Sequence, residues 1–321
     1  MVAAHRGVAA GAAENTIAAF TNAIDVGADM VEFDVRRTCD RELIAFHDAT
    51  VGGVPVNFLT RGEIEAAAGV KPPLLTEVLR ACAGRIRLDV ELKEDGYVQD
   101  VMAVLRAGFD PAQMIITSFL PSVVAQAKDA FPEVKTGLLV GDGGSLADVA
   151  ARLRELYPVD VARQVRADYL APHYRLASLG VLRRAAAAGL PCLLWTVNSP
   201  VLIRRYAADP RVAAIITDVA AQAVSIVAGA GAARLDRRPE AVSLAGGEAS
   251  PVDVDLVVDD LQVLADLGQL GEHVGAMGLQ EGQPFRLVAR AGRDQFGVAA
   301  DAPDGHAGGT QLGADDDPLE V

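Results

Sequence analysis

Acidic residues recur at alternate positions in two apolar segments of the chain. Glu32 and Asp34 lie two residues apart in "VEFDV". The segment "RLDVELK" contains Asp89, Glu91 and Lys93 at every second position. In a β-strand, residues i and i+2 point to the same face, so each set would project from one side of its strand. Carboxylates placed side by side need a cation, and an all-oxygen set without thiolates suits Mg²⁺, Ca²⁺ or Mn²⁺ better than zinc.

Two histidines accompany these acids. His5 and Arg6 follow a short apolar run at the start of the chain, and His47 precedes Asp48 in "FHD". Imidazole can accept or donate a proton near neutral pH, so the two histidines could supply a general base and a general acid. Arg6 and Lys93 beside a bound cation would form a positive pocket, whose natural ligand is a phosphate group. These residue types indicate metal-assisted cleavage of a phosphate ester.

The elements that would position these residues alternate regularly. Up to about residue 228, short β-branched runs alternate with Ala- and Leu-rich helical stretches, as βα units do. We expect strands at residues 2–6, 30–35, 86–92, 113–118, 134–140, 168–172, 191–197 and 213–217. We expect helices near residues 15–26, 75–83, 97–107, 121–130, 145–156, 178–188, 200–208 and 219–228. An insertion at about 36–74 separates the second strand from its helix.

The pattern predicts an α/β fold, a (β/α)8 TIM barrel, because eight βα units in this length match that architecture. The alternative is an open doubly wound sheet. That fold would carry a G-x-G-x-x-G sequence after the first strand and gather its polar residues at one switch point, and this sequence does neither. A TIM barrel builds its active site where the strands end, at the C-terminal face.

Three aromatic or imidazole side chains follow other predicted strands. Trp195, the only tryptophan, lies at a strand end and is expected to line the pocket rather than the core. Phe119 could serve either purpose. His173, in "APHY", lies at the same end of the barrel, but a lone histidine is more often structural than functional.

Two further acids have less direct expectations. Asp89 lies one layer deeper in the barrel than the end of its strand, so we expect it to support Arg6 or Lys93 rather than bind a metal. Asp218 directly precedes the last predicted helix and is expected to cap it.

Seven motifs appear in order along the chain: "AHRG", "ENTIAAF", "VEFDV", "FHD", "DVELK", "WTVN" and "IITD". In this order and spacing they resemble the glycerophosphodiester phosphodiesterase (GDPD) family, and the resemblance covers about residues 1–226. It implies a TIM barrel with a small insertion after strand two, one divalent metal, and hydrolysis of a glycerophosphodiester to glycerol 3-phosphate and an alcohol. Such substrates arise from phospholipid breakdown.

The resemblance also implies roles for single residues. The positions that match the family's metal ligands are Glu32, Asp34 and Glu91. The positions that match its acid/base pair are His5 and His47. Arg6 and Lys93 match the groups that hold the phosphate oxygens, Glu14 and Asn15 match a polar pair near the metal, and Trp195 matches a residue on the glycerol side. His5 as base and His47 as acid is the preferred assignment, with either water or the substrate's own glycerol hydroxyl as nucleophile.

Two departures from the family pattern concern loops. Ala13 stands where a proline usually precedes "ENT", and the segment after "HD" lacks the common "L-x-R-T-T". These differences bear on substrate choice more than on the chemistry. One alternative is therefore a phospholipase D acting on lysophospholipids or sphingomyelin, although the short polar insertion argues mildly against an apolar entrance. Another is a catalytically silent barrel used for binding, which would lack a ligand or a histidine, and this chain retains them all.

Charge divides the chain near residue 228. Residues 229–321 contain 17 Asp and Glu against 6 Arg and no Lys, so they carry most of the formal net charge of −14. We therefore predict a catalytic domain at 1–228 and an acidic tail of unassigned role at 229–321, in which 252–270 could form a strand or an amphipathic helix and 298–318 is expected to be disordered. An acidic protein without a basic patch is a poor partner for nucleic acid or an anionic membrane.

Other features predict where the protein works. The charged pair near the N-terminus precedes any apolar signal region, which favours a cytoplasmic location. The most apolar window, 212–233, is interrupted by Asp218 and Gln222, so we do not expect a membrane-inserted segment. Cys39, Cys82 and Cys192 are widely spaced and are expected to be free thiols. The expected partner is a small glycerophosphodiester, and the oligomeric state is not predicted.

Overall fold

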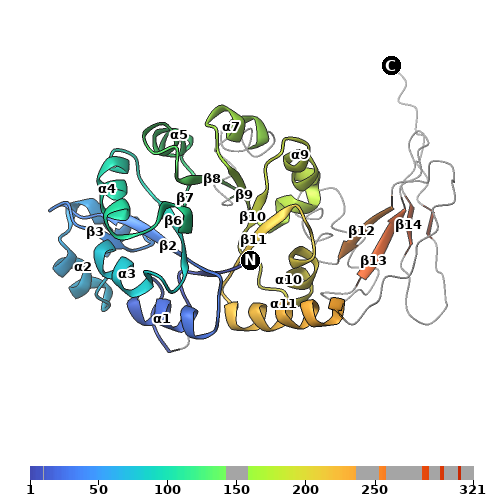
Figure 1. Ribbon diagram of the computed structural model, residues 1–321, viewed down its shortest axis with the longest axis horizontal. Coiled ribbons are helices and arrows are strands. Elements are labelled where there is room, and N and C mark those ends of the chain that lie inside the picture. The colour runs from blue at the N-terminus through green and yellow to red at the C-terminus, as the bar shows by residue number, and fades with distance from the viewer. Residues whose placement is uncertain are drawn as a thin grey trace, which may run out of the picture. The chain divides into compact units, whose positions relative to one another are not determined.

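The protein is described by a computed structural model of its 321 residues (Figure 1). The described residues are 1–9, 11–141 and 158–235, together with four short strands beyond residue 252. The chain divides into two units, Met1–Asp236 and Arg237–Val321. All the candidate site residues belong to the first unit.

Within the described part of the first unit, eight parallel strands form a closed barrel, as the sequence predicted. The strands lie side by side in the order β1, β11, β10, β9, β8, β7, β6 and β2, and β2 pairs again with β1. Their bounds are β1 Val2–His5, β2 Met30–Arg37, β6 Arg87–Leu92, β7 Met114–Ser118, β8 Lys135–Val140, β9 Tyr169–Pro172, β10 Cys192–Leu194 and β11 Val212–Thr217. The first and last residues of each strand differ from the predicted ones by at most three positions.

Helices surround this ring of strands on the outside (Figure 1). They are α1 Ile17–Asp25, α3 Leu75–Cys82, α4 Val98–Gly108, α5 Pro121–Ala130, α7 Pro158–Gln164, α8 Tyr174–Leu176, α9 Leu182–Ala187, α10 Pro200–Ala207 and α11 Ala220–Leu235, with short turns η2 Pro111–Gln113 and η3 Ala177–Val181. The helix expected at 145–156 lies outside the described residues. The short helix α7 was not predicted, and α11 continues seven residues beyond its predicted end.

The insertion after β2 has its own small core. It contains β3 Leu43–Ala45, antiparallel to β2, the paired strands β4 Thr50–Val51 and β5 Val54–Pro55, the turn η1 Val56–Phe58 and helix α2 Arg61–Ala68. Ile44, Val51, Val56 and Ile64 form its buried cluster. A reciprocal capping box between Thr60 and Glu63 begins helix α2.

A layer of apolar side chains fills the barrel interior below the site. Its buried members include Ala3, Met30, Ile115, Leu139, Ala171, Leu193, Ala214 and Ile216. These residues come from strands around the ring, because alternate residues of each strand point inward. The layer therefore forms a packed floor, and the polar residues of the strands' C-terminal ends lie above it.

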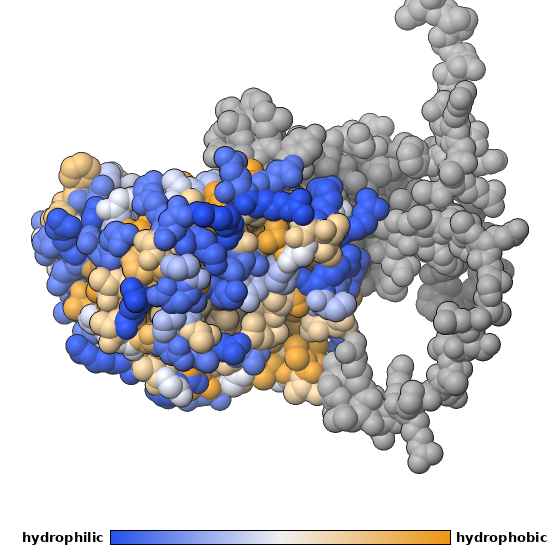
Figure 2. Space-filling model, turned by 45° about the horizontal axis from the view of Figure 1, so that its top comes forward, coloured by the Kyte–Doolittle hydropathy of each residue, from blue (hydrophilic) through white to orange (hydrophobic). Residues whose placement is uncertain are grey.

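Figure 2 shows hydrophilic residues over much of the face in view, with smaller apolar areas between them. No helix among the described residues combines the length and the apolar character needed to cross a membrane. Cys39, Cys82 and Cys192 are free thiols, as expected.

The second unit contains an antiparallel sheet of β12 Asp253–Val257, β13 Pro284–Val288, β14 Gly297–Ala299 and β15 Thr310–Gln311, in that order. The segment expected to be either strand or helix therefore begins as a strand. β15 lies within residues 298–318, and β14 overlaps the start of that segment, where no strand was predicted. The rest of that segment lies outside the described residues.

Candidate active site

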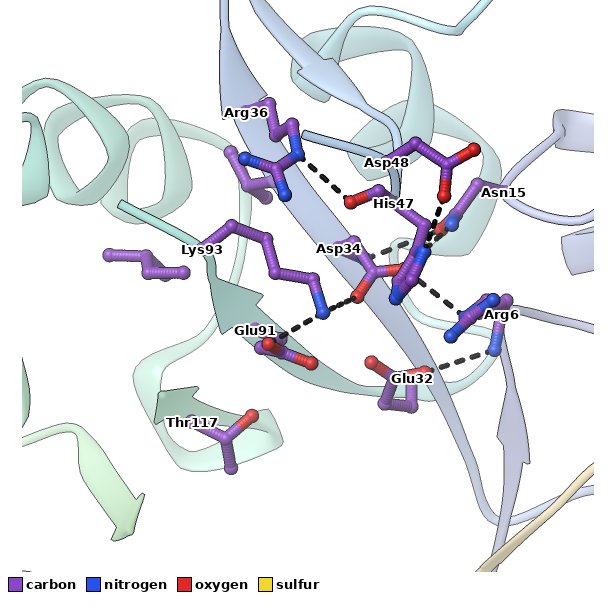
Figure 3. A network of polar contacts seen from close by, with 12 residues as sticks. Arg6, Asn15, Glu32, Asp34, Arg36, His47, Asp48, Glu91, Lys93 and Thr117 are labelled. Atoms are coloured by element: carbon purple, nitrogen blue, oxygen red, sulfur yellow. Dashed lines mark hydrogen bonds and ion pairs between the residues drawn. The ribbon is translucent and has the colours of Figure 1, made fainter. Parts of the chain in front are cut away.

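Three carboxylates converge at the C-terminal end of the barrel. One oxygen atom from each of Glu32, Asp34 and Glu91 lies within 4.8 Å of the others. The parallel register explains the convergence, since Asp34 on β2 pairs directly with Glu91 on β6, and Glu32 lies two residues earlier on the same face. Figure 3 shows the three carboxylates grouped on neighbouring strands.

The burial of these acids is costly without a cation. Desolvation, followed by repulsion from Asp34, raises the pKa of Glu32 well above its usual value. Desolvation also raises the pKa of Glu91 to about 7 against the opposing effect of Lys93. Asp34 Oδ1 and Glu91 Oε1 are buried, and each lies close to the ammonium of Lys93. Three buried carboxylates with one ammonium among them have lone pairs to spare, and this all-oxygen set fits a hard divalent cation.

Lys93 lies between two of the carboxylates. Its Nζ is 2.8 Å from Asp34 Oδ1 and 2.6 Å from Glu91 Oε1. Burial would raise the pKa of Asp34, but Lys93, together with Asn15 and Arg6, holds it below its usual value. Lys93 therefore keeps Asp34 ionised, and its ammonium lies where it can also meet a phosphate oxygen.

The turn after β1 carries Arg6 to the same place. Arg6 and Asn15 both adopt left-handed backbone conformations, with φ of 54° and 55°, and Asn15 N donates to Arg6 O. Arg6 N donates to Glu32 Oε2 at 3.0 Å, and its guanidinium lies 2.8 Å from Glu14 Oε2 and 3.4 Å from Asp34 Oδ2. Asn15 Nδ2 donates to Asp34 Oδ2 at 2.8 Å. Asn15 therefore contacts the carboxylate of Asp34 directly, whereas Glu14 contacts Arg6, which in turn contacts Asp34.

Asp218, which follows the last barrel strand, orients His5. Its Nδ1 lies 2.6 Å from Asp218 Oδ1, and its Nε2 lies 3.9 Å from Glu32 Oε2. The other Asp218 oxygen accepts from Asn198 Nδ2 at 2.7 Å. The expectation that Asp218 caps the last helix is therefore wrong, because both of its oxygens bind side chains of the site. Pairing of β1 with β11 brings the two residues together.

His47 is held by its neighbour and by an arginine that the sequence did not single out. Its Nδ1 lies 2.9 Å from Asp48 Oδ1. Arg36 on β2 donates from Nε to the His47 carbonyl at 2.9 Å (Figure 3). It also donates from Nη1 to Glu94 at 2.7 Å. Partial burial lowers the pKa of His47, although Asp48 acts in the opposite direction. Arg36 thus fixes the backbone of a candidate acid/base residue.

Asp89 does not meet Arg6 or Lys93, contrary to expectation. It accepts a hydrogen bond from Thr117 Oγ1 at 2.7 Å, deep in the barrel. Burial raises its pKa to about 7. Its register partners on β2 and β7 place it one layer below Glu91, and it is not among the three acids that share one potential cation position.

These groups line a pocket of about 280 Å³ that also contains Trp195 and Phe119. The two aromatic rings pack edge to face at 5.4 Å, and Trp195 Nε1 donates to the Ala171 carbonyl at 2.8 Å. His173 packs against the edge of Trp195 at 5.0 Å and accepts from Arg175 N at the start of α8, so it has the structural contacts expected of it. The pocket therefore joins an acidic and basic side to an aromatic wall.

Comparisons with known proteins agree with this arrangement. The sequence model described as "Glycerophosphoryl diester phosphodiesterase family" matches residues 5–222. A glycerophosphodiester phosphodiesterase of Caldanaerobacter subterraneus is 28% identical over 219 residues, which are 62% of this chain and 86% of that protein. A Bacillus subtilis relative is 31% identical over 157 residues, and this chain spans 65% of its length.

A solved structure shows the same fold. It is an Oleispira antarctica phosphodiesterase in complex with the product sn-glycerol 3-phosphate, 22% identical, with a TM-score of 0.57 over 71% of this chain and 96% of its own. The family match covers more than half of the chain and includes each of the three carboxylates and both histidines. The chain belongs to the glycerophosphoryl diester phosphodiesterase family.

Proposed function

We propose that this protein hydrolyses glycerophosphodiesters to sn-glycerol 3-phosphate and an alcohol with the help of one divalent cation. The observation that carries the proposal is the convergence of Glu32, Asp34 and Glu91. Glu32 and Glu91 line one pocket with His5 and His47. Family membership supports the reaction class. The Oleispira antarctica protein, whose fold is similar, binds sn-glycerol 3-phosphate as its product.

Glu32, Asp34 and Glu91 would hold the cation. When bound, Mg²⁺, Ca²⁺ or Mn²⁺ would act as a Lewis acid toward the non-bridging phosphate oxygens. Arg6 and Lys93 add positive charge on the same side, where negative charge grows on the phosphoryl group during the reaction. The three acids alone would repel a phosphate, so a cation at this position and these two side chains reverse the sign of the local field.

The two histidines move the protons. In the proposed sequence, His5 takes a proton from the nucleophile, whose oxygen forms a bond to phosphorus. The bond from phosphorus to the alcohol oxygen breaks, its electron pair stays on that oxygen, and His47 supplies the proton. The nucleophile is either water or the glycerol hydroxyl of the substrate, the latter giving a cyclic phosphate that water then opens. Asp218 holds His5 through Nδ1, which leaves Nε2 on the side of Glu32.

An assay with the purified full-length chain tests the proposal. Incubation with a panel of glycerophosphodiesters and Mg²⁺, Ca²⁺ or Mn²⁺ should release sn-glycerol 3-phosphate, detected enzymatically. EDTA should abolish the release, and His47→Ala should lower kcat by about 10²- to 10⁴-fold, the usual contribution of a general acid. Release of choline from lysophosphatidylcholine or sphingomyelin, without turnover of any glycerophosphodiester, would favour the phospholipase D alternative. Turnover of none of these substrates would contradict the proposal. A cytoplasmic location stays a prediction of the sequence.

A further inference from the structure

Arg36 follows the metal-binding carboxylates of β2 toward the C-terminal end of the barrel. Glu32, Asp34 and Arg36 alternate along the strand, so their side chains share one face of it. Only 8% of Arg36 is exposed. A buried guanidinium needs acceptors, and the two that Arg36 uses belong to different segments of the chain. Arg36 therefore connects two parts of the wall around the site.

One of these segments carries His47. The backbone pairing of β2 with β3 reaches Phe46, whose N–H donates to the Asp34 carbonyl at 3.0 Å. His47 follows directly, beyond the last residue of β3, and its carbonyl accepts from Arg36 Nε at 2.9 Å (Figure 3). Its Nδ1 lies 2.9 Å from Asp48, which leaves Nε2 for the substrate. The Arg36 contact thus continues the attachment of this segment to β2 past the end of the strand pairing.

The other segment carries Lys93. Arg36 Nη1 donates at 2.7 Å to Glu94 Oε1, which comes directly after Lys93 in the segment that follows β6. The N–H of Glu94 donates to the hydroxyl of Tyr97 at 3.2 Å. That hydroxyl donates in turn to the Val35 carbonyl on β2 at 2.7 Å. Because Tyr97 is fully buried, the backbone of Glu94 is held in place before its carboxylate meets Arg36.

We propose that Arg36 is a positioning residue: by binding the segments of His47 and Lys93 together, it holds the His47 imidazole at the leaving oxygen while Lys93 contacts the phosphate. This inference rests on the proposed function and adds to it the residue that sets the geometry of the proton donor. Arg36 is not part of the lining of the metal pocket, so it acts through His47 and not on the substrate.

Transfer of a proton to the leaving oxygen depends steeply on geometry. When the bond from phosphorus to the alcohol oxygen breaks, its electron pair stays on that oxygen, and His47 supplies the proton from Nε2 within hydrogen-bond reach. Displacement of a catalytic group by about 1 Å can lower the rate about 100-fold. The His47 side chain is 40% exposed, so packing alone restrains it little. A contact that holds its backbone therefore bears on the chemical step.

Substrates that differ in the leaving alcohol test this role. Choline, released from glycerophosphocholine, is a poor leaving group that needs the proton, whereas 4-nitrophenol, released from the 4-nitrophenyl ester of glycerol phosphate, departs as a stable phenolate. Arg36→Met removes both donors and retains the length of the side chain. It should lower kcat for glycerophosphocholine by about 10- to 100-fold and kcat for the 4-nitrophenyl ester by less than about threefold.

Arg61 provides the matched control. It lies in the insertion and makes the same two kinds of contact, from Nε to the Pro72 carbonyl and from Nη2 to Glu77, both at 2.7 Å. Its side chain is 16% exposed, against 10% for Arg36. Arg61→Met should lower the Tm by an amount similar to that for Arg36→Met, and the ratio of kcat for the two substrates should keep its parent value. The pair of variants separates a loss of stability from a displaced proton donor.

A double-mutant cycle with His47 gives a second test. If Arg36 acts through His47, Arg36→Met has nothing left to impair once His47→Ala has removed the proton donor. The kcat of the double variant for glycerophosphocholine should therefore equal that of His47→Ala within about twofold. Two independent roles would instead multiply the two losses.

The outcomes separate this inference from the proposed function. An equal loss of kcat for both substrates, the same selective loss in Arg61→Met, or multiplied losses in the double variant would each overturn the role of Arg36 and leave the hydrolysis standing. Absence of turnover for every glycerophosphodiester would overturn the proposed function and this inference with it. A loss confined to the poor leaving group, and absent in the His47→Ala background, would support the assignment.

Discussion

The chemistry of the site depends on acids that are buried at a cost. Glu32 and Glu91 have raised pKa values because burial disfavours their ionised forms, while Lys93 keeps Asp34 ionised. A divalent cation would stabilise all three in the ionised form, so binding would release protons near neutral pH. Two neighbours of this cluster, Asp218 and Asp89, allow separate tests of catalysis and of stability.

Asp218→Asn should impair proton transfer by His5. The carboxylate lies 2.6 Å from His5 Nδ1 and orients the imidazole ring. We expect kcat to fall by about 10- to 100-fold with a smaller change in KM, because the residue acts through His5 and not on the substrate. Steady-state kinetics that determine kcat and KM separately measure this split.

The control for this variant is Asp209→Asn. Asp209 pairs with Arg211 by two side-chain hydrogen bonds near the start of β11, away from the pocket lining. Its loss should lower stability and leave kcat unchanged. If both variants lowered kcat equally, the proposed role of Asp218 would be wrong.

Asp89→Asn should make the cation-free protein more stable at neutral and alkaline pH. Burial raises the pKa of Asp89 from its usual value of 3.8 to about 7. The native state therefore retains a proton that the unfolded chain loses, and the free energy of unfolding falls as pH rises from about 4 through about 7. Asparagine has no such titration and can still accept from Thr117.

Thermal denaturation in EDTA between pH 5 and pH 8 measures this effect. The Tm of the variant minus that of the parent should increase with pH. Each kcal/mol of difference in the free energy of unfolding corresponds to about 2–4 °C. A difference that stays constant over this range would show that Asp89 does not retain its proton in the folded protein.

The turn between β1 and α1 positions Arg6 through a tightly packed glycine. Gly7 has φ of +87°, and a Cβ placed on it would lie 2.7 Å from the backbone carbon of Ala19 in α1. This contact lets Val8 N bond to the Ala19 carbonyl and brings Arg6 N to Glu32. The strand end and the helix thus hold the arginine from both sides.

Gly7→Ala should lower the free energy of unfolding more than Gly27→Ala, the matched control at another glycine with positive φ. Gly27 has φ of +77° but nothing within 4 Å of its added Cβ, so it isolates the backbone strain, which costs about 1–2 kcal/mol. Gly7→Ala adds the steric clash, worth about 1–3 kcal/mol more, and should displace Arg6. Urea denaturation measures the stabilities, and kcat/KM should fall for Gly7→Ala alone. Equal losses of stability would contradict the packing argument.

The division of the chain into two units makes the contribution of the acidic segment testable. All the residues that we assign to the site lie in Met1–Asp236, and α11 runs to Leu235. The boundary predicted from charge, at 228, would remove the last two turns of that helix. A cut after residue 236 keeps the helix whole.

A chain ending at residue 236 should therefore retain kcat/KM within about threefold of the full-length value, since no assigned group is lost. A chain ending at 228 should have a lower Tm, because part of a helix packed against β1 and α10 is removed. Circular dichroism and the glycerol 3-phosphate assay measure the two quantities. A loss of activity on removal of 237–321 would show that this segment contributes to the site.

The amino-acid sequence by itself determined the chemical types of the site and the barrel that holds them. The spacing of two residues put Glu32 and Asp34 on one face of their strand, and Glu91 and Lys93 on one face of theirs. The eight βα units predicted a closed ring whose strand ends meet at one face. These features are local or periodic, so they can be predicted before any long-range contact is known. The seven motifs added the family, and the family match confirmed it.

Only the tertiary structure decided the partners of those residues. His5 meets Asp218 across 213 positions of sequence because the last strand closes the barrel against the first, and Arg36 reaches the carbonyl of His47 because β2 and β3 fold back on each other. Asp89 bonds Thr117 through the register of β6 and β7. Such contacts follow from strand register and ring closure, which join distant residues and leave no trace in local spacing.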